Sequence, residues 1–184
     1  MEKYCFGIDI GGTTTKCGLF TIDGTLLDKW EIVTNTENAG ERILPDAAEA
    51  VLGKICEKGI CKEDVVGIGV GVPGPVKEDG SLAVAVNLHW GYHHVVDEME
   101  SLTGIRTKAG NDANVATLGE MWKGGGAGYD NVLLITLGTG VGSGIIVNGK
   151  IVTGAHGAAG EIGHAHVEDN IKEPCNCGNY GCLE

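Results

Sequence analysis

The sequence has few basic residues and no long apolar run. Lysine and arginine together number 13 against 25 aspartates and glutamates, so the formal net charge is −12. Proteins that bind nucleic acid or anionic membranes contact phosphate through clustered lysine and arginine, so this charge argues against both partners. No stretch reaches the ~18 apolar residues of a membrane span, and the amino-terminal residues contain no signal-peptide core. We therefore expect a cytoplasmic protein that binds neither nucleic acid nor membrane.

The sequence also lacks the commonest nucleotide-binding loop. No Gly-x-x-x-x-Gly-Lys-Ser/Thr segment occurs, which excludes a P-loop enzyme. Residues 69–74 spell a dinucleotide-binding fingerprint, but Pro73 and Pro75 rule out the helix whose amino terminus would hold a pyrophosphate. That match is therefore spurious.

Glycine is abundant, with 32 residues that cluster in loops between apolar runs, where the backbone can approach a ligand closely. The apolar pattern predicts a meander of three strands, and then two further strands and three helices. The meander strands are expected at 4–10, 16–21 and 25–33, the other strands at 65–72 and 105–109, and the helices at 39–58, 94–103 and 111–122.

A glycine run at 124–128 ends this first pattern, and the opening order of strands and turns then returns. Strands are expected at 131–137, 141–147 and 150–153. The recurrence predicts two related half-domains, the first over 1–123 and the second over 124–184.

Each half has a glycine turn after its first strand. Backbone N–H groups and hydroxyls in such turns suit phosphate oxygens, and a neighbouring carboxylate suits a magnesium ion. Two turns that face each other would hold the phosphates of a nucleotide from both sides. The alternative is that both are simply tight hairpin turns. The first set is Asp9, Gly11, Gly12, Thr13 and Thr14, and the second, without a carboxylate, is Gly138, Thr139 and Gly140.

Asp112 lies where a strand ends and a helix begins. A carboxylate in that position caps free N–H groups at a helix start. The same carboxylate can also accept the proton of a sugar hydroxyl as it attacks a phosphoryl group. Both interpretations stay open on the residues alone.

A cluster of soft ligands lies near residue 184. Cys175, Cys177 and Cys182 follow His164, and three thiolates with one imidazole are the composition of a closed structural zinc site. His166 competes with His164 for the fourth position. A disulfide is the alternative for the cysteines, but three thiols leave one unpaired, so zinc is favoured.

These motifs together resemble the ROK sugar kinases, of the actin-like superfamily, over the whole chain. The cysteine signature at 175–184 is highly specific, whereas the glycine turns are shared by the superfamily; the other matching segments are 9–13, 110–114, 137–142 and 161–164. The resemblance implies an α/β fold of the actin-like, ribonuclease H-like type, with a mixed five-stranded sheet and helices, followed by the incomplete start of a second such domain.

The resemblance also implies an activity, the ATP-dependent phosphorylation of a hexose with Mg²⁺ and a structural Zn²⁺. Asp112 is implied as the general base, and His164 rather than His166 as the zinc ligand beside the three cysteines. The likeness to bacterial glucokinases favours glucose over mannose, fructose, allose or N-acetylmannosamine, and the family implies a homodimer. The implied sugar-binding residues are Asn87, Asn111, Asp112, Glu161, His164 and Glu184.

Family kinases have a substantially longer chain, whose later helices complete the adenosine pocket, so we expect this chain to be truncated at its carboxyl end. Two other functions remain. The chain could bind sugar and zinc without activity. A sugar-responsive transcriptional regulator of the same family would need a DNA-binding domain before the first glycine turn, where only eight residues precede Asp9.

Overall fold

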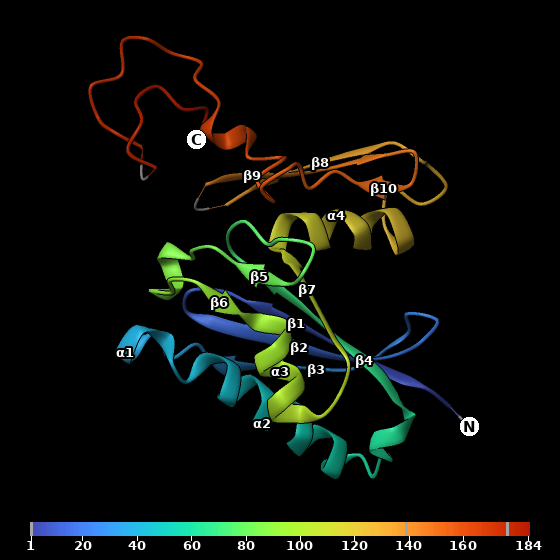
Figure 1. Cartoon of the computed structure of the whole chain (residues 1–184). Helices are drawn as coiled ribbons and strands as arrows, with labels where there is room; N and C mark the ends of the chain where they lie inside the picture. Colours follow the sequence, from blue (N-terminus) through green and yellow to red (C-terminus); the bar gives the residue numbers. More distant parts are fainter. Residues whose placement is uncertain (1, 139, 176) are drawn as a thin grey trace. The chain divides into compact units, whose positions relative to one another are not determined.

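The chain forms two compact units in a computed structural model that describes residues 2–138, 140–175 and 177–184 (Figure 1). The first unit ends at Asp112 and the second is Ala113–Glu184. The expected division of the chain after residue 123 stays a prediction.

A mixed five-stranded sheet forms the centre of the first unit, as expected. Its order is β3-β2-β1-β4-β7, with the first three strands antiparallel and β4 and β7 parallel to β1. This is the actin-like arrangement that the resemblance implied. The strands are β1 (Tyr4–Ile10), β2 (Thr14–Thr21), β3 (Leu26–Val33), β4 (Val65–Val72) and β7 (Thr107–Asn111).

One face of this sheet carries the apolar core, because side chains alternate between the two faces of a strand. Phe6, Ile8 and Ile10 of β1 are buried on that face. Strand β4 has glycine at every second position from Gly67 to Gly71, between the buried Ile68 and Val70. The two faces of β4 therefore differ sharply in the volume of their side chains.

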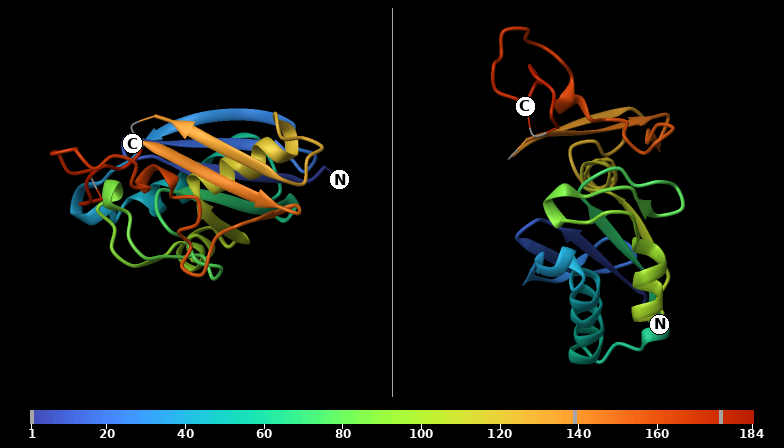
Figure 2. Two further views of the ribbon diagram at one scale, coloured as in Figure 1. Left: turned by 90° about the horizontal axis from the view of Figure 1, so that it is seen from above. Right: turned by 60° about the vertical axis from the view of Figure 1, so that its left-hand side comes forward.

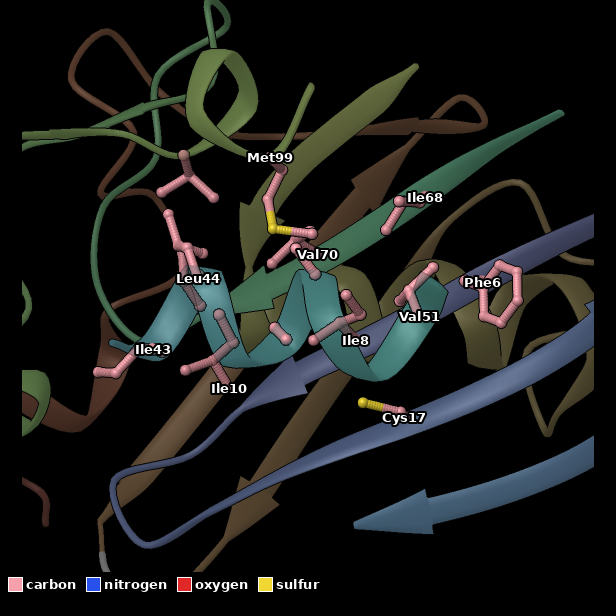
Figure 3. Packing of buried hydrophobic residues seen from close by; sticks show 14 of the residues in the cluster. Phe6, Ile8, Ile10, Cys17, Ile43, Leu44, Val51, Ile68, Val70 and Met99 are labelled. Carbon is pink, nitrogen blue, oxygen red and sulfur yellow. The ribbon is translucent and has the colours of Figure 1, made fainter. Parts of the chain in front are cut away.

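Two helices, α2 (Ile43–Glu57) and α3 (Val95–Thr103), cover the apolar face. Figure 3 shows Leu44 and Val51 of α2 packed over Ile8 and Ile10, with Met99 of α3 beside them. Burying one such aliphatic side chain contributes about 1.5–3 kcal/mol to folding. A glycine with positive φ follows the end of each helix, two residues after Glu57 at Gly59 (62°) and directly after Thr103 at Gly104 (64°).

The helix expected over 39–58 is wrong at its start. Asn38, Ala39 and Gly40 have positive φ, and they form part of a short distorted turn, α1 (Glu37–Gly40), before α2 begins. A Cβ on Gly40 would lie 2.6 Å from Trp90 Nε1, which instead donates a hydrogen bond to Gly40 O at 3.1 Å. This tertiary contact overrides the helical periodicity.

The expected strand at 105–109 ends two residues too early, and the expected helix at 111–122 begins one residue too early. Strand β7 continues to Asn111, which pairs with Val72, and helix α4 (Asp112–Lys123) begins at the next residue. The long loop before α3 contains two short paired strands that the sequence did not predict, β5 (Ser81–Leu82) and β6 (His93–His94). Two 3₁₀ turns complete the unit, η1 (Lys62–Asp64) and η2 (Val86–Leu88).

The second unit contains a three-stranded antiparallel sheet of order β10-β9-β8, the counterpart of β3-β2-β1 (Figure 2). Its strands are β8 (Val132–Leu137), β9 (Val141–Val147) and β10 (Lys150–Ile151), and the 3₁₀ turn η3 (Ile162–His164) follows. Helix α4 lies so close to β9 that a Cβ on Gly144 would be 2.0 Å from Thr117 Oγ1. Within the described ranges, no helix is long and apolar enough to cross a membrane.

Candidate functional site

The carboxyl ends of β1, β4 and β7 meet at one edge of the first sheet, because the three strands are parallel. Asp9 on β1 pairs with Gly71 on β4, which in turn pairs with Gly110 on β7. Asp112 follows β7 directly and is exposed. Open parallel sheets bind their ligands outside this edge.

Gly71 separates the two aspartates at this edge. A Cβ on Gly71 would lie 3.7 Å from Asp9 Oδ1 and 3.7 Å from Asp112 Cα. The space beside the Asp9 carboxylate is therefore kept open by the absence of a side chain.

The first glycine turn is closed by its own backbone, since Gly11 N–H donates to Thr14 O at 3.1 Å. The Thr13 carbonyl accepts from Thr34 N–H at 2.9 Å, which fixes the turn to the end of β3. A Cβ on Gly12 would lie 3.3 Å from Asn87 O. The structure thus places Asn87, an expected sugar contact, directly against the turn expected to bind phosphate.

Asn111 links β7 to the Pro73-Gly74-Pro75 loop. Its side chain is 8% exposed, and Nδ2 donates to Gly74 O at 3.2 Å. The loop and the residue before Asp112 are therefore held in one arrangement, which fixes the direction in which the chain enters α4.

The second glycine turn connects β8 to β9 in the second unit. Gly138 N–H donates to Gly140 O at 3.0 Å, and Val141 N–H donates to Glu184 Oε2 at 3.3 Å. Thr139 lies outside the described residues, so its expected contact with phosphate stays a prediction.

Four expected metal ligands gather in the second unit. The ligand atoms of His164, Cys175, Cys177 and Cys182 all lie within 4.8 Å of one another. The distance from Cys175 Sγ to His164 Nδ1 is 3.6 Å, and that from Cys177 Sγ to Cys182 Sγ is also 3.6 Å. Ligand atoms about 2.0–2.3 Å from a tetrahedral zinc ion lie roughly 3.5–3.8 Å apart, so this set fits zinc.

All seven cysteines of the sequence are free thiols. The Asn179 backbone N–H lowers the pKa of the Cys177 thiol, which favours the thiolate form that binds a metal. The pKa values of the other two thiols in the cluster are raised in the absence of a metal, that of Cys182 chiefly by burial and that of Cys175 to about 12 beside Glu184.

His166 has different partners from His164. Its Nδ1 lies 2.9 Å from Tyr180 O, and its Nε2 lies 2.7 Å from Asp169 Oδ1. The Asp169 carboxylate, followed by the Tyr180 carbonyl, raises the pKa of His166. Both ring nitrogens of His166 therefore face hydrogen-bond acceptors, while His164 faces the cysteines.

Two carboxylates adjoin His164. Glu161 Oε2 lies 4.0 Å from His164 Nε2, and Glu184 Oε1 lies 3.4 Å from His164 Nδ1. Glu184 Oε1 also accepts a hydrogen bond from the Cys175 thiol at 3.0 Å. The Cys175 bond, followed by the Val141 N–H, lowers the pKa of Glu184. The structure thus brings together three of the expected sugar contacts, and these groups can accept hydrogen bonds from hydroxyls.

Comparison with known proteins gives consistent matches over nearly the whole chain. The sequence pattern of the ROK family matches residues 5–184 of this chain. A glucokinase from Halalkalibacterium halodurans is 46% identical over 184 residues, which are 100% of this chain and 56% of that protein. A glucokinase from Thermotoga maritima is 38% identical over 180 residues, or 97% of this chain and 55% of that protein.

Among solved structures, a ROK family glucokinase from Streptomyces griseus in complex with glucose and AMPPNP superposes with a TM-score of 0.84 at 35% identity. The match covers 97% of this chain and 55% of that one. This chain therefore spans about half the length of the curated relatives that it matches.

Proposed function

We propose, from the premise that this chain belongs to the ROK family, that it carries the sugar-binding and phosphate-binding half of an ATP-dependent hexose kinase. The observation that carries the proposal is the placement of Asp9 and Asp112 on either side of Gly71, at the edge where the parallel strands end. Glucose is the proposed sugar, because the relatives from Halalkalibacterium and Thermotoga are named glucokinases and the Streptomyces griseus structure contains glucose.

Asp112 is the proposed general base. Its carboxylate accepts the proton of the sugar 6-hydroxyl as that oxygen attacks the γ-phosphoryl group, while positioning supplies most of the rate. Asp9 and the N–H groups of the first glycine turn other than that of Gly11, which is bonded to Thr14 O, would hold the phosphates with Mg²⁺, and the ion would neutralise charge on the phosphates. The second turn, including Thr139, contributes further phosphate donors.

The proposed sugar contacts share an amide, carboxylate or imidazole group, each of which forms hydrogen bonds with hydroxyls. Asn111 is supported by its fixed bond to Gly74 O, and Glu184 by its fixed bond to Val141 N–H. The complete proposed set is Asn87, Asn111, Asp112, Glu161, His164 and Glu184.

A structural zinc ion is proposed for the cysteine cluster, with His164, Cys175, Cys177 and Cys182 as its ligands. His164 would bind the zinc ion through one ring nitrogen, which would fix the orientation of the ring and direct its other nitrogen toward the sugar. The homodimer and the cytoplasmic location stay predictions.

Replacing Asp112 by Asn tests the base role. We expect turnover to fall by about 10²–10⁴-fold, because the amide cannot take the hydroxyl proton, while glucose affinity changes little. Turnover is measured by glucose-dependent ADP release in a chain extended to the length of its relatives with their remaining carboxyl-terminal segment. Glucose affinity is measured by calorimetric titration of the same proteins.

Asp97→Asn provides the matched control, since Asp97 is an exposed carboxylate on α3. It should leave turnover unchanged. Turnover of the Asp112→Asn protein within twofold of the parent would remove Asp112 from the base role.

Elemental analysis of the purified chain tests the metal site. We expect about one zinc per chain in the parent and in His166→Gln, because the partners of His166 are Tyr180 O and Asp169. We expect strong loss of zinc in His164→Gln, because a closed site needs its fourth ligand. Equal zinc content in the two variants would contradict the proposed ligand set.

A further inference from the structure

A closed loop in the first unit carries Asn87, one of the proposed sugar contacts. Ala85 N–H donates to Trp90 O at 3.0 Å, and Trp90 N–H donates back to Ala85 O at 3.1 Å. The 3₁₀ turn η2 lies between these two residues, and Leu88 at its end is fully buried. Asn87 therefore lies at the tip of a loop, residues 85–90, whose two ends are joined by backbone hydrogen bonds.

The Trp90 side chain joins this loop to the left-handed turn before α2. It is 2% exposed, and its Nε1 donates to Gly40 O at 3.1 Å. Its ring also stacks on the His93 ring of β6, with the ring centres 4.5 Å apart and an angle of 14° between the planes. A Cβ on Gly40 would lie 2.6 Å from Nε1 and 2.7 Å from Leu88 O, so the contact requires glycine there. Residues outside the loop thus hold the indole on two sides.

The tip of the loop lies on the first glycine turn. A Cβ on Gly12 would lie 3.3 Å from Asn87 O and 3.6 Å from Asn87 Cβ. A second contact holds the loop from outside, since His89 Nδ1 lies 3.3 Å from Thr36 O, but that pair is exposed to water. The bond of the Trp90 indole is buried, so water does not compete for it, and a buried carbonyl that lost its donor would be costly. The indole is therefore the main anchor of the loop.

We infer that Trp90 is a positioning residue for the sugar site, and that it holds Asn87 in place through the hydrogen bond from its indole to Gly40 O. When that bond is lost, the loop opens more often, and Asn87 moves away from the glycine turn. A loop that is ordered before the sugar arrives binds it more tightly, because less conformational entropy is lost on binding. The inference rests on the proposed role of Asn87 as a sugar contact.

Amide hydrogen exchange tests whether the indole holds the loop closed, without any sugar. The ¹⁵N-labelled 19.1 kDa chain is small enough for NMR, and the Ala85 amide donates one of the two closing bonds. Exchange at Val70, in the middle of the sheet, reports unfolding of the whole unit. We expect Trp90→Phe to speed exchange at Ala85 by about tenfold or more relative to Val70, because a phenyl ring cannot donate to Gly40 O. Equal relative exchange in parent and variant would overturn the inference.

Trp30→Phe is the matched control. Trp30 of β3 packs edge-on against Phe6 in the same core, with the ring centres 6.2 Å apart. The same change there should leave exchange at Ala85, relative to Val70, within about twofold of the parent, because distant sites act independently. A change at Ala85 as large as that in Trp90→Phe would show a general loss of stability and would contradict the role of Trp90.

A more conservative replacement covers the case in which Trp90→Phe does not fold. In benzothienylalanine a sulfur atom replaces the indole N–H, and the size and shape of the ring system are nearly kept. A chain with this analogue in place of Trp90 keeps the packing against His93 and loses the donor to Gly40 O. It should still speed exchange at Ala85. Parent-like exchange would contradict the hydrogen bond as the link between the indole and the loop.

Steady-state kinetics test the effect on the sugar site, in the chain extended with the carboxyl-terminal segment of its relatives. We expect Trp90→Phe to raise the KM for glucose about tenfold and to change kcat less than about threefold, because the loop is already ordered once glucose is bound. A purely structural effect would lower the amount of active protein, and so kcat, and would leave KM unchanged. That result would overturn the inference.

A double-mutant cycle decides whether Trp90 acts through Asn87. Asn87→Ala alone should raise the KM for glucose, and Trp90→Phe added to it should raise KM by less than about twofold more, because residues that act as a unit are not additive. Fully additive effects would overturn the inference. Absence of glucose-dependent turnover in the parent would instead contradict the proposed kinase, and amide exchange alone would then decide whether Trp90 holds the loop.

Discussion

Ala39 has a left-handed backbone conformation, with φ of 58°, although it carries a Cβ. Its neighbours are also left-handed, because Gly40 must place its carbonyl on Trp90 Nε1. Residues other than glycine and asparagine are disfavoured in this left-handed conformation by about 1–2 kcal/mol. The backbone strain at Ala39 therefore arises from the contact between this turn and the loop that carries Asn87.

Ala39→Gly should relieve that strain. We expect the free energy of unfolding to rise by roughly 0.5 kcal/mol, since the relief exceeds the extra flexibility that glycine brings to the unfolded chain. Urea unfolding measures the change. Asn38→Gly should give a smaller gain because asparagine tolerates this conformation, and a loss of stability in Ala39→Gly would contradict the argument.

Individual site residues were partly predictable from the sequence. Spacing alone left His164 and His166 as equal candidates, and the hydrogen bonds of His166 to Asp169 and Tyr180 distinguish them in the structure. These partners lie up to 14 residues away, beyond the reach of local pattern. Glu184 and Val141 are 43 residues apart in the sequence, and no sequence motif predicts their contact.

At the scale of elements, local pattern predicted well where burial follows a simple period. The core of α2 was found because Ile43, Leu44, Val51 and Ile55 repeat with helical spacing and are all buried. Its start was missed because the turn before it is shaped by Trp90, from another part of the chain. Strand β7 was misplaced because Asn111 is polar and yet pairs inside the sheet.

Leu44→Ala tests the packing of α2 on the sheet. Leu44 is 1% exposed in the core, so its truncation should lower the free energy of unfolding by about 2–5 kcal/mol. Leu102→Ala on α3 is the matched control, because Leu102 is 41% exposed and should cost under about 1 kcal/mol. Equal losses in the free energy of unfolding for the two variants, measured by thermal or urea unfolding, would show that Leu44 of α2 does not pack in this core.

At the scale of the whole molecule, the fold was predictable because several separate motifs agreed with one architecture. The mixed five-stranded sheet follows from that agreement, whereas the apolar pattern alone gave only the strands and not their order. The exposed apolar face of β8 belongs to this scale too. Leu133, Ile135 and Leu137 alternate along the strand, with exposed fractions of 60%, 49% and 81%.

We expect the 184-residue chain to associate as its concentration rises, because a contiguous apolar sheet face buries itself against another copy. Sedimentation velocity over a range of concentrations measures this association. Leu133→Thr with Ile135→Thr should weaken it, while the same pair of changes at Val66 and Val84, which are exposed elsewhere, should not. A chain that stays monomeric at high concentration would contradict the prediction.

The pairing of β1 with β4, and of β4 with β7, decides when the first sheet can be completed during synthesis. Asp9 belongs to a strand whose neighbours on one side are encoded far later in the chain. A ribosome that adds about 5–20 residues per second leaves the first hairpin waiting several seconds for them. During synthesis the three amino-terminal strands therefore emerge with one edge unpaired, and the two aspartates meet only after nearly the whole first unit has left the ribosome.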